Sequence, residues 1–183
     1  MKKIILAFLM GVLPFGLVVA KDYEVDTSHS QIEFKIKHLS VSNVSGNFGK
    51  FAGSVSVENN ALTALNGEVD VNSINTNDKT RDEHIKDPEY FDVAKFPKAT
   101  LKLVKMNGTN GTFDLTIKGI TKQVTLNVEV FGTSKNMSGN EVVGLELSGK
   151  INRKDFDIAS GYPNVTLGEE VTIAIGIEGI SKK

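Results

Sequence analysis

Residues 31–38 read Gln31-Ile-Glu-Phe-Lys-Ile-Lys-His38, a strict alternation of polar and apolar side chains. Successive side chains of a strand point to opposite faces, so Ile32, Phe34 and Ile36 share one face and charged residues share the other. The pattern predicts a strand with one buried face. The same alternation recurs along the chain in further apolar sets: Phe51, Val55, Val57; Leu65, Val69, Val71; Leu101, Leu103; Phe113, Leu115, Ile117; Val124, Leu126, Val128, Val130; Val143, Leu145, Leu147, Ile151; and Val171, Ile173, Ile175, Ile177.

Turn-forming residues separate these sets, and the chain has only four prolines. Many short strands between such turns are typical of an antiparallel meander or barrel. Closure into a barrel removes exposed sheet edges, and about eight strands give an interior that side chains nearly fill or that holds one small ligand. The phase of the alternation shifts at Gly49-Lys50, which predicts a bulge or a sharp bend. We therefore expect an all-β, antiparallel, eight-stranded barrel.

One segment, residues 77–86, departs from the strand pattern. It is rich in charge and lacks a run of β-branched residues, and Asn77 or Asp78 is a suitable N-cap. Asp87-Pro88 follows it, and the residue before a proline disfavours helical backbone. We expect one short helix inserted between strands.

The first twenty residues have the features of a cleavable export signal. Lys2 and Lys3 precede an apolar run from Ile4 to Val19, and Ala20 ends a small-residue cleavage site. Cleavage there leaves one domain, residues 21–183, with 19 basic and 22 acidic residues and a net charge of −3. This balance argues against binding to nucleic acids and to anionic membranes. With no cysteine, the chain has no disulfide and no lipid-modified cysteine anchor. We expect a periplasmic or secreted protein without a stable membrane anchor.

The periodicity alone leaves open whether the barrel interior is packed or hollow. The inward sets are aliphatic or phenylalanine, which suits a packed core and an apolar guest equally well. Two inward positions do not suit a packed core. His38 continues the face of Ile36, and Arg153 continues the face of Ile151. A buried arginine needs compensation, so we expect Arg153 to meet a carboxylate (Asp82 or Asp155), a ligand head group or solvent.

Several ordered blocks resemble the YceI-like family and span essentially the whole mature chain. They are Asp26-Thr-Ser-His-Ser-Gln-Ile-Glu-Phe34, His38-Leu-Ser-Val-Ser-Asn-Val-Ser-Gly-Asn-Phe48, Ser73-Ile-Asn-Thr76, Arg81-Asp-Glu-His-Ile85, Tyr90-Phe-Asp-Val-Ala-Lys-Phe-Pro97, Leu115-Thr-Ile-Lys-Gly-Ile-Thr-Lys122 and Ile151-Asn-Arg-Lys-Asp-Phe156. The chain departs from the family pattern at Asp157, where glycine is usual, which affects the local turn and the cavity edge.

The resemblance implies an extended, lipocalin-like barrel that binds a polyisoprenoid or another long-chain amphiphile. It also implies a periplasmic location, a homodimer, and no cofactor. We expect a lipid tail to contact inward apolar residues, and His38, Arg81, His84 and Arg153 to contact the head group. The two arginines would hold a phosphate. The expected tail contacts are Phe34, Ile36, Phe48, Phe51, Phe91, Phe96, Leu101, Leu103, Phe113, Leu115, Leu126 and Ile151.

Other functions are weighed against lipid binding. His29, His38 and His84, with Asp26, Asp82 and Glu83, are candidate zinc ligands for an enzyme. However, the odd spacing of His29 and His38 places them on opposite faces of an unbroken strand, and no metalloprotease, nucleophile-elbow or P-loop motif occurs. A filled barrel that binds a protein partner is a second alternative. A scavenger of hydrophobic compounds is a third, and it would use the same physics as a lipid carrier.

Overall fold

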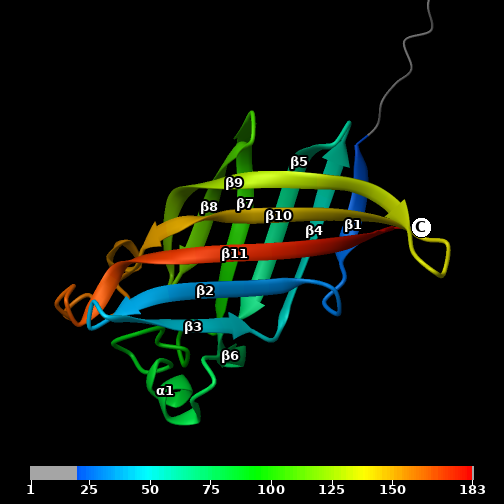
Figure 1. The fold of residues 1–183 in the computed structure, drawn as a ribbon. Coiled ribbons are helices and arrows are strands. Elements are labelled where there is room, and N and C mark those ends of the chain that lie inside the picture. The colour runs from blue at the N-terminus through cyan, green and yellow to red at the C-terminus, as the bar shows by residue number, and fades with distance from the viewer. Residues whose placement is uncertain (1–19, 183) are drawn as a thin grey trace, which may run out of the picture.

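A computed structural model describes residues 20–182 and shows a closed antiparallel barrel (Figure 1). Neighbouring strands pair around the barrel in the order β1-β4-β5-β7-β8-β9-β10-β11, and β11 pairs back with β1. The expected eight-stranded barrel is confirmed. The expected export signal lies outside the described residues except for Ala20. The bounds are β1 (Lys21–Val25), β4 (Phe51–Glu58), β5 (Ala61–Asp70), β7 (Lys98–Asn107), β8 (Asn110–Ile117), β9 (Ile120–Lys135), β10 (Glu141–Asn152) and β11 (Leu167–Ser181).

The long strand β11 has two partners on the same edge. Its residues 179–181 pair with β1, whereas its residues 167–176 pair with β2 (Gln31–His38). β2 continues to β3 (Ser42–Phe48) and β3 to β6 (Ile74–Asn75), so these three strands extend the sheet beyond the ring. Figure 1 shows β2 and β3 beside β11, on the side of the molecule that carries α1. Different strands therefore form the barrel wall next to β11 at its two ends: β1 at one end and β2 at the other.

The phase shift at Gly49-Lys50 is a bend between two strands. β3 ends at Phe48 and β4 begins at Phe51. β3 pairs with β2 and β6, whereas β4 pairs with β1 and β5. The bend is fixed by a hydrogen bond from the Gly49 backbone N–H to the Ser73 carbonyl, at 3.1 Å. It carries the chain from the extension into the ring.

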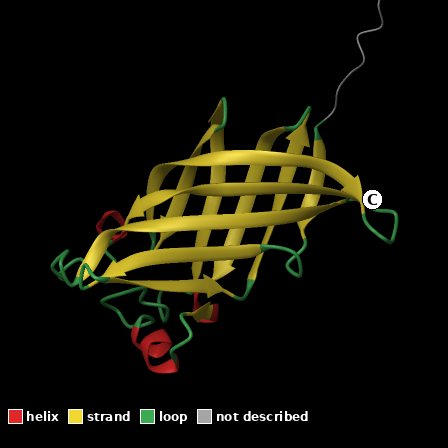
Figure 2. Cartoon of the chain, in the orientation of Figure 1, coloured by secondary structure: helices red, strands yellow, loops and turns green. Residues whose placement is uncertain are grey.

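The expected helix is α1 (Lys79–His84), and Asp78 is its N-cap. The Asp78 carboxylate accepts hydrogen bonds from the backbone N–H groups of Thr80 and Arg81, which would otherwise lack partners. The other helical elements of residues 20–182 are two 3₁₀ turns, η1 (Val71–Ser73) and η2 (Arg153–Phe156). Figure 2 shows these turns among the long loops, outside the strands. Among residues 20–182, no helix has the length and apolar character needed to cross a membrane.

Two clusters of buried apolar residues occupy the barrel. We call the first the filled end, because Phe113, Leu126, Val143, Leu145 and Leu147 in it have no exposed surface. The second cluster includes Val71, Leu115, Ile117, Ile151 and Phe156, and it lies toward η1 and η2. The inward alternation predicted from the sequence accounts for the strand residues of both clusters, whereas Val93 and Phe156 lie outside the strands.

Candidate ligand-binding cavity

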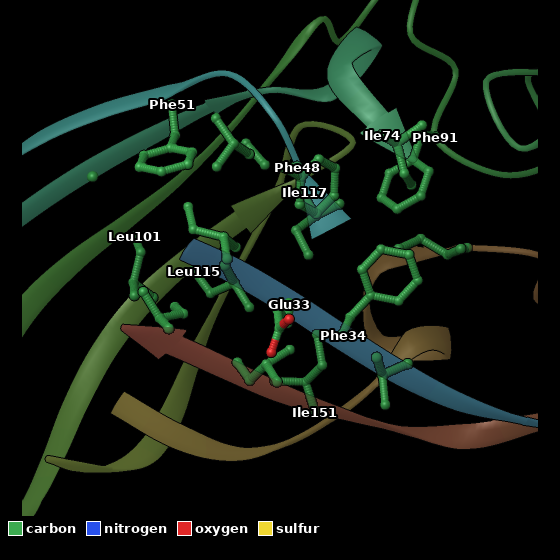
Figure 3. Close-up of a pocket in the computed structure, with 18 of the residues that line it drawn as sticks. Glu33, Phe34, Phe48, Phe51, Ile74, Phe91, Leu101, Leu115, Ile117 and Ile151 are labelled. Carbon is green, nitrogen blue, oxygen red and sulfur yellow. The ribbon is translucent and has the colours of Figure 1, made fainter. Parts of the chain in front are cut away.

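A cavity of about 380 Å³ opens within the barrel, and its wall is drawn in Figure 3. Its lining comes from β1 to β8, from β10 and β11, and from the segment around α1. Ligand cavities of proteins usually measure about 300–1,000 Å³, so this one has the size of a binding site. The interior of this barrel is therefore not uniformly packed.

Three phenylalanines from separate segments form one side of the cavity (Figure 3). The ring centroids of Phe34 and Phe48 are 5.8 Å apart, and those of Phe48 and Phe91 are 6.4 Å apart with the rings edge-on. These separations are those of favourable aromatic contacts. Gly46 leaves room for this arrangement, because a Cβ at Gly46 would lie 2.5 Å from Cζ of Phe34. The aromatic side thus depends on a glycine in β3.

The aliphatic side of the cavity is lined mainly by β2 and β11. We call the hollow half the part of the barrel lined by Ile32, Phe34, Ile36, Ile173 and Ile175. These side chains point inward but remain only half-buried. In the filled end, residues with the same inward position are fully buried. Partial exposure on an inward face means that neighbouring side chains leave part of their surface uncovered, and this surface is apolar.

Polar side chains gather at one end of the cavity, near α1. The Arg81 Nε donates to the Thr76 hydroxyl and its Nη2 donates to the Thr76 carbonyl, both at 2.8 Å. The His84 Nδ1 lies 3.2 Å from the Asp87 carboxylate, and its ring stacks edge-on against Tyr90 with centroids 5.0 Å apart. Thr76, Arg81, His84 and Tyr90 line the cavity. Hydrogen-bonding groups beside an apolar tunnel are suited to an amphiphile.

Arg153 is buried, with 1% of its surface exposed, and it pairs with neither Asp82 nor Asp155. Of the three expected partners for Arg153, the carboxylate is therefore wrong. All five of its N–H donors are engaged by backbone carbonyls, a partner that was not among those expected. Desolvation in this site lowers the pKa of Arg153. The acceptors are Gly168 at 2.8 Å from Nε, Ile158 at 2.9 Å and Ala159 from Nη1, and Tyr162 at 3.0 Å and Leu167 at 2.9 Å from Nη2.

This arrangement leaves Arg153 no free donor for a head group, although part of the residue lines the cavity. A phosphate site made by Arg81 and Arg153 together is not formed. Asp82 is also occupied, because it accepts from the Thr76 backbone N–H and hydroxyl at 2.8 and 2.6 Å. Arg153 serves to hold the loop of residues 157–167 against the end of the barrel.

Most of the residues expected to contact a ligand line this cavity. They are Phe34, Ile36, His38, Phe48, Phe51, Arg81, His84, Phe91, Leu101, Leu115, Ile151 and Arg153. Four others lie elsewhere. Phe113 and Leu126 belong to the filled end, and Leu103 packs against it. Phe96 lies over Gly119 in the β8–β9 turn. Strand parity placed Leu103, Phe113 and Leu126 inward but could not tell which end of the barrel they fill, and Phe96 was expected from the aromatic segment after the helix.

The cavity is also lined by residues that were not predicted to contact a ligand. Ile32, Ile173 and Ile175 had been recognised as inward but not assigned to a ligand. Tyr90 begins the family-like block of residues 90–97, and its position just after the expected helix could have indicated that it lies at the cavity. Tyr162 lies in an irregular loop and carries no periodic signal. Its hydroxyl donates to Glu89 at 3.3 Å, and its ring centroid is 5.8 Å from that of Tyr90.

The three histidines do not come together. Within residues 20–182, one group has donor atoms close enough to share a metal ion, namely Asp26, His29 and Glu178. The His29 Nδ1 lies 2.7 Å from the Asp26 carboxylate and 3.8 Å from that of Glu178. The Asp26 hydrogen bond raises the pKa of His29, and the His29 hydrogen bond lowers the pKa of Asp26. These contacts describe an exposed ion pair, and His38 and His84 lie at the cavity instead.

Asp157 adopts the left-handed conformation that glycine would favour, with φ of 53°. Asp tolerates this conformation better than most side chains. Its carboxylate also lies 3.4 Å from the Lys118 Nζ and accepts from the Ser160 hydroxyl at 2.5 Å. The turn after η2 is thus kept with aspartate in the place of glycine.

Comparison with known proteins places these features in one family. A family profile described as the YceI-like domain matches residues 23–179. A UPF0312 protein of Enterobacter sp. (strain 638) is 37% identical over the full length of both chains, and the protein YceI of Salmonella newport is 34% identical over the same extent.

Solved structures share the same architecture. The YCEI protein of Campylobacter jejuni has a TM-score of 0.72 at 33% identity, over 81% of this chain and 91% of that one. A polyisoprenoid-binding domain from Saccharophagus degradans has a TM-score of 0.67 at 15% identity, over 87% of this chain and 98% of that one. At that identity the second likeness concerns the fold alone.

Proposed function

This chain belongs to the YceI-like family, and on that premise we propose that its barrel binds a long-chain amphiphilic lipid without catalysing a reaction. Candidate ligands are a polyisoprenoid, a quinone-like molecule, and a fatty acid or fatty amide. The observation that carries the proposal is the apolar cavity of about 380 Å³ in the hollow half, closed at the other end by the filled end. The polyisoprenoid-binding domain of similar fold supports a ligand of this class.

Burial of the tail supplies the affinity in this proposal. Each buried methylene contributes roughly 0.8 kcal/mol before ordering costs, so ten give about 8 kcal/mol, which is enough for micromolar binding. Affinity therefore rises with the length of the tail until the cavity is full. The polar end, with Arg81, His84 and Tyr90, selects among head groups by hydrogen bonds.

The hydrogen bonds of Arg153 indicate which kind of head group the polar end can bind. Because all its donors are satisfied by carbonyls, Arg81 is the one arginine at the polar end with hydrogen-bonding capacity to spare. A head group that accepts a few hydrogen bonds fits this set better than one that needs a paired-arginine clamp. We therefore favour a neutral or singly charged head group over a pyrophosphate.

The same proposal includes the setting in which the protein acts. Export by residues 1–20 would place the barrel in the periplasm, where an insoluble lipid needs a protein to cross water. Carriage, storage and scavenging all use this cavity in the same way.

A cavity-filling variant with a matched control tests the proposal. Ile36→Trp places an indole in the cavity, whereas Lys35→Trp places it on the outer face of the same strand. We expect a fluorescent fatty acid to bind saturably to the wild type and to Lys35→Trp, and Ile36→Trp to bind it at least about tenfold more weakly. Mass spectrometry of an organic extract identifies the native ligand.

Two results would contradict lipid binding. One is a wild-type protein that neither releases a long-chain amphiphile nor takes up the fluorescent fatty acid. The other is an Ile36→Trp protein, folded by circular dichroism, that binds the fatty acid as tightly as the wild type does.

A further inference from the structure

Three exposed apolar side chains stand together at the tip of two neighbouring loops. Leu39 and Val41, in the β2–β3 turn, are 52% and 83% exposed, and Val165, just before β11, is 63% exposed. The loops are tied together, because the Leu39 backbone N–H donates to the Thr166 carbonyl at 2.9 Å and the Ser40 hydroxyl to the Val165 carbonyl at 3.4 Å. We call Leu39, Val41 and Val165 the apolar tip.

The backbone of the apolar tip is in an unfavourable conformation for its sequence. Leu39 and Ser40 both have positive φ, of 50° and 60°. The left-handed region is costly for a leucine, and turns of this kind usually use Asn or Gly. A strained residue that also exposes apolar surface contributes little to folding, so a binding role is a better explanation.

The apolar tip adjoins the cavity. His38 precedes it in β2, and Thr166 and Leu167 follow it at the start of β11, and all three line the cavity. Figure 1 shows the β2–β3 turn and the loop before β11 at the same end of the barrel. A surface that covered the apolar tip would lie next to the polar end of the cavity.

Although residues 21–183 carry a net charge of −3, which argues against binding to anionic membranes, the charges beside the apolar tip are basic. Lys35 and Lys37 project from the outer face of β2, are exposed, and have no ion-pair partner within residues 20–182. The acidic residues at the start of β11 are neutralised, because Glu169 lies 3.1 Å from Lys154 and Glu170 lies 2.6 Å from Lys150. Exposed apolar side chains beside unpaired lysines are the combination that binds an anionic lipid surface.

We propose that the apolar tip docks the barrel onto a membrane that contains anionic lipids, with the cavity end facing the bilayer. Leu39, Val41 and Val165 enter the interface between head groups and tails, and Lys35 and Lys37 attract the anionic head groups. Docking would allow a lipid to transfer between the bilayer and the cavity, and this role rests on the proposed function. The docking itself requires no ligand.

Tryptophan reporters test the docking directly, because the chain contains no tryptophan. Val41→Trp places the reporter on the apolar tip. Met137→Trp, in the β9–β10 turn, is the control, because Met137 is 107% exposed and lies at the other end of the barrel (Figure 1). Each protein is mixed with vesicles of phosphatidylethanolamine and phosphatidylglycerol, with or without bromine in the lipid tails.

We expect Val41→Trp to shift to shorter emission wavelengths and to be quenched by brominated tails, while Met137→Trp does neither. Adding Leu39→Asp and Val165→Asp to Val41→Trp should weaken vesicle binding at least about tenfold. Adding Lys35→Gln and Lys37→Gln to Val41→Trp should remove most of the dependence of vesicle binding on phosphatidylglycerol and on salt.

Three outcomes would overturn the docking. If the emission of Val41→Trp does not change when vesicles are added, the apolar tip does not bind lipid. If Val41→Trp and Met137→Trp respond alike, the apolar tip has no special affinity for lipid. A blue shift that grows with protein concentration in the absence of vesicles would assign the apolar tip to a second copy of the chain. Uptake of the fluorescent fatty acid by the same Val41→Trp protein reports on the cavity, so failure of lipid binding and failure of docking are distinguished.

Discussion

The filled end and the hollow half are built by the same rule and serve different purposes. In both, every second residue of a strand faces inward and is apolar. Phe113, Leu126 and Leu145 in the filled end have no exposed surface, whereas Phe34 and Ile173 in the hollow half are half-buried. The difference shows that an apolar inward face does not by itself decide between a core and a binding site.

The change of partner along β11 provides a structural reason for the difference. Where β11 pairs with β1, the ring is closed and Tyr23 fills the interior, with 2% of its surface exposed. The Tyr23 hydroxyl donates to Glu141 at 2.6 Å, and burial, with this hydrogen bond, raises the pKa of Tyr23 to about 12. Where β11 pairs with β2, the wall continues into β3 and β6 and encloses more space than its side chains fill.

The hollow half compensates for missing packing with hydrogen bonds, and Arg153 provides the strongest set. We expect Arg153→Met to lower the free energy of unfolding by about 4 kcal/mol, because buried carbonyls lose charge-assisted hydrogen bonds. Urea denaturation followed by circular dichroism measures this loss. Faster proteolysis within residues 157–167 should accompany it.

Arg81→Met is the matched control, because the Arg81 side chain is 38% exposed and is hydrogen-bonded mainly to Thr76. We expect it to cost under about 1 kcal/mol. An Arg153→Met protein as stable as Arg81→Met would show that the loop does not depend on the arginine, and that the hollow half is held by its apolar contacts after all.

Two leucines with the same predicted role separate packing from binding. Leu126 lies in the filled end, fully buried, and Leu101 lines the cavity and is half-buried. We expect Leu126→Ala to lower the free energy of unfolding by about 3 kcal/mol and Leu101→Ala by about 1 kcal/mol, because the latter extends a space that already exists. Urea denaturation gives both values.

Binding should show the opposite ranking. We expect Leu101→Ala to weaken binding of the fluorescent fatty acid several-fold and Leu126→Ala to leave it unchanged. Equal losses of stability in the two variants, or a loss of binding in Leu126→Ala alone, would mean that the division between filled end and hollow half is not the one described.

The sequence was sufficient for the barrel, for most of its strands, for a helix capped by Asn77 or Asp78 and for most of the cavity wall, because these follow from local periodicity and capping. It gave no periodic signal for β1, β3 or β6. It was not sufficient for the level at which each inward residue lies along the barrel. That level depends on strand register and on which strand β11 joins at each point, and both are set by contacts between distant segments. Phe113 and Leu126 were therefore assigned to the ligand, although they lie in the filled end.

Arg153 illustrates a second reason. Its burial was predictable from parity, but three of its five carbonyl partners lie in the irregular loop before β11, and loop conformation leaves no periodic trace in the sequence. The same is true of Tyr162, which reaches the cavity from that loop. The apolar tip is similar, because Val165 joins Leu39 and Val41 only through the fold.

The junction between the two regions supports a last and smaller prediction. Asp26, His29 and Glu178 lie where β11 leaves β1 for β2, and the Ser30 hydroxyl bridges the Glu178 backbone, donating at 3.3 Å and accepting at 3.0 Å. The pKa of His29 is raised above its ordinary value of 6.5 by Asp26, so its stabilising effect is complete below that pH and is lost as the pH rises through the raised pKa.

The pKa of Asp26 is lowered from its ordinary value of 3.8, so its stabilising effect is present above that value and is lost as the pH falls through the lowered pKa. The pair should therefore contribute most between about pH 4 and pH 6. We expect His29→Gln to lower the urea midpoint in that window and to match the wild type at a pH well above the raised pKa of His29, where the imidazole is neutral. His84→Gln is the control, because it leaves the junction intact. If the pH-dependent loss of stability arises at the junction, the urea midpoint of His84→Gln should vary with pH as that of the wild type does. If the urea midpoint of His29→Gln were lower than that of the wild type by the same amount at every pH, the effect would come from lost packing of the ring. The two regions would then be joined by hydrogen bonds of the backbone and Ser30 alone.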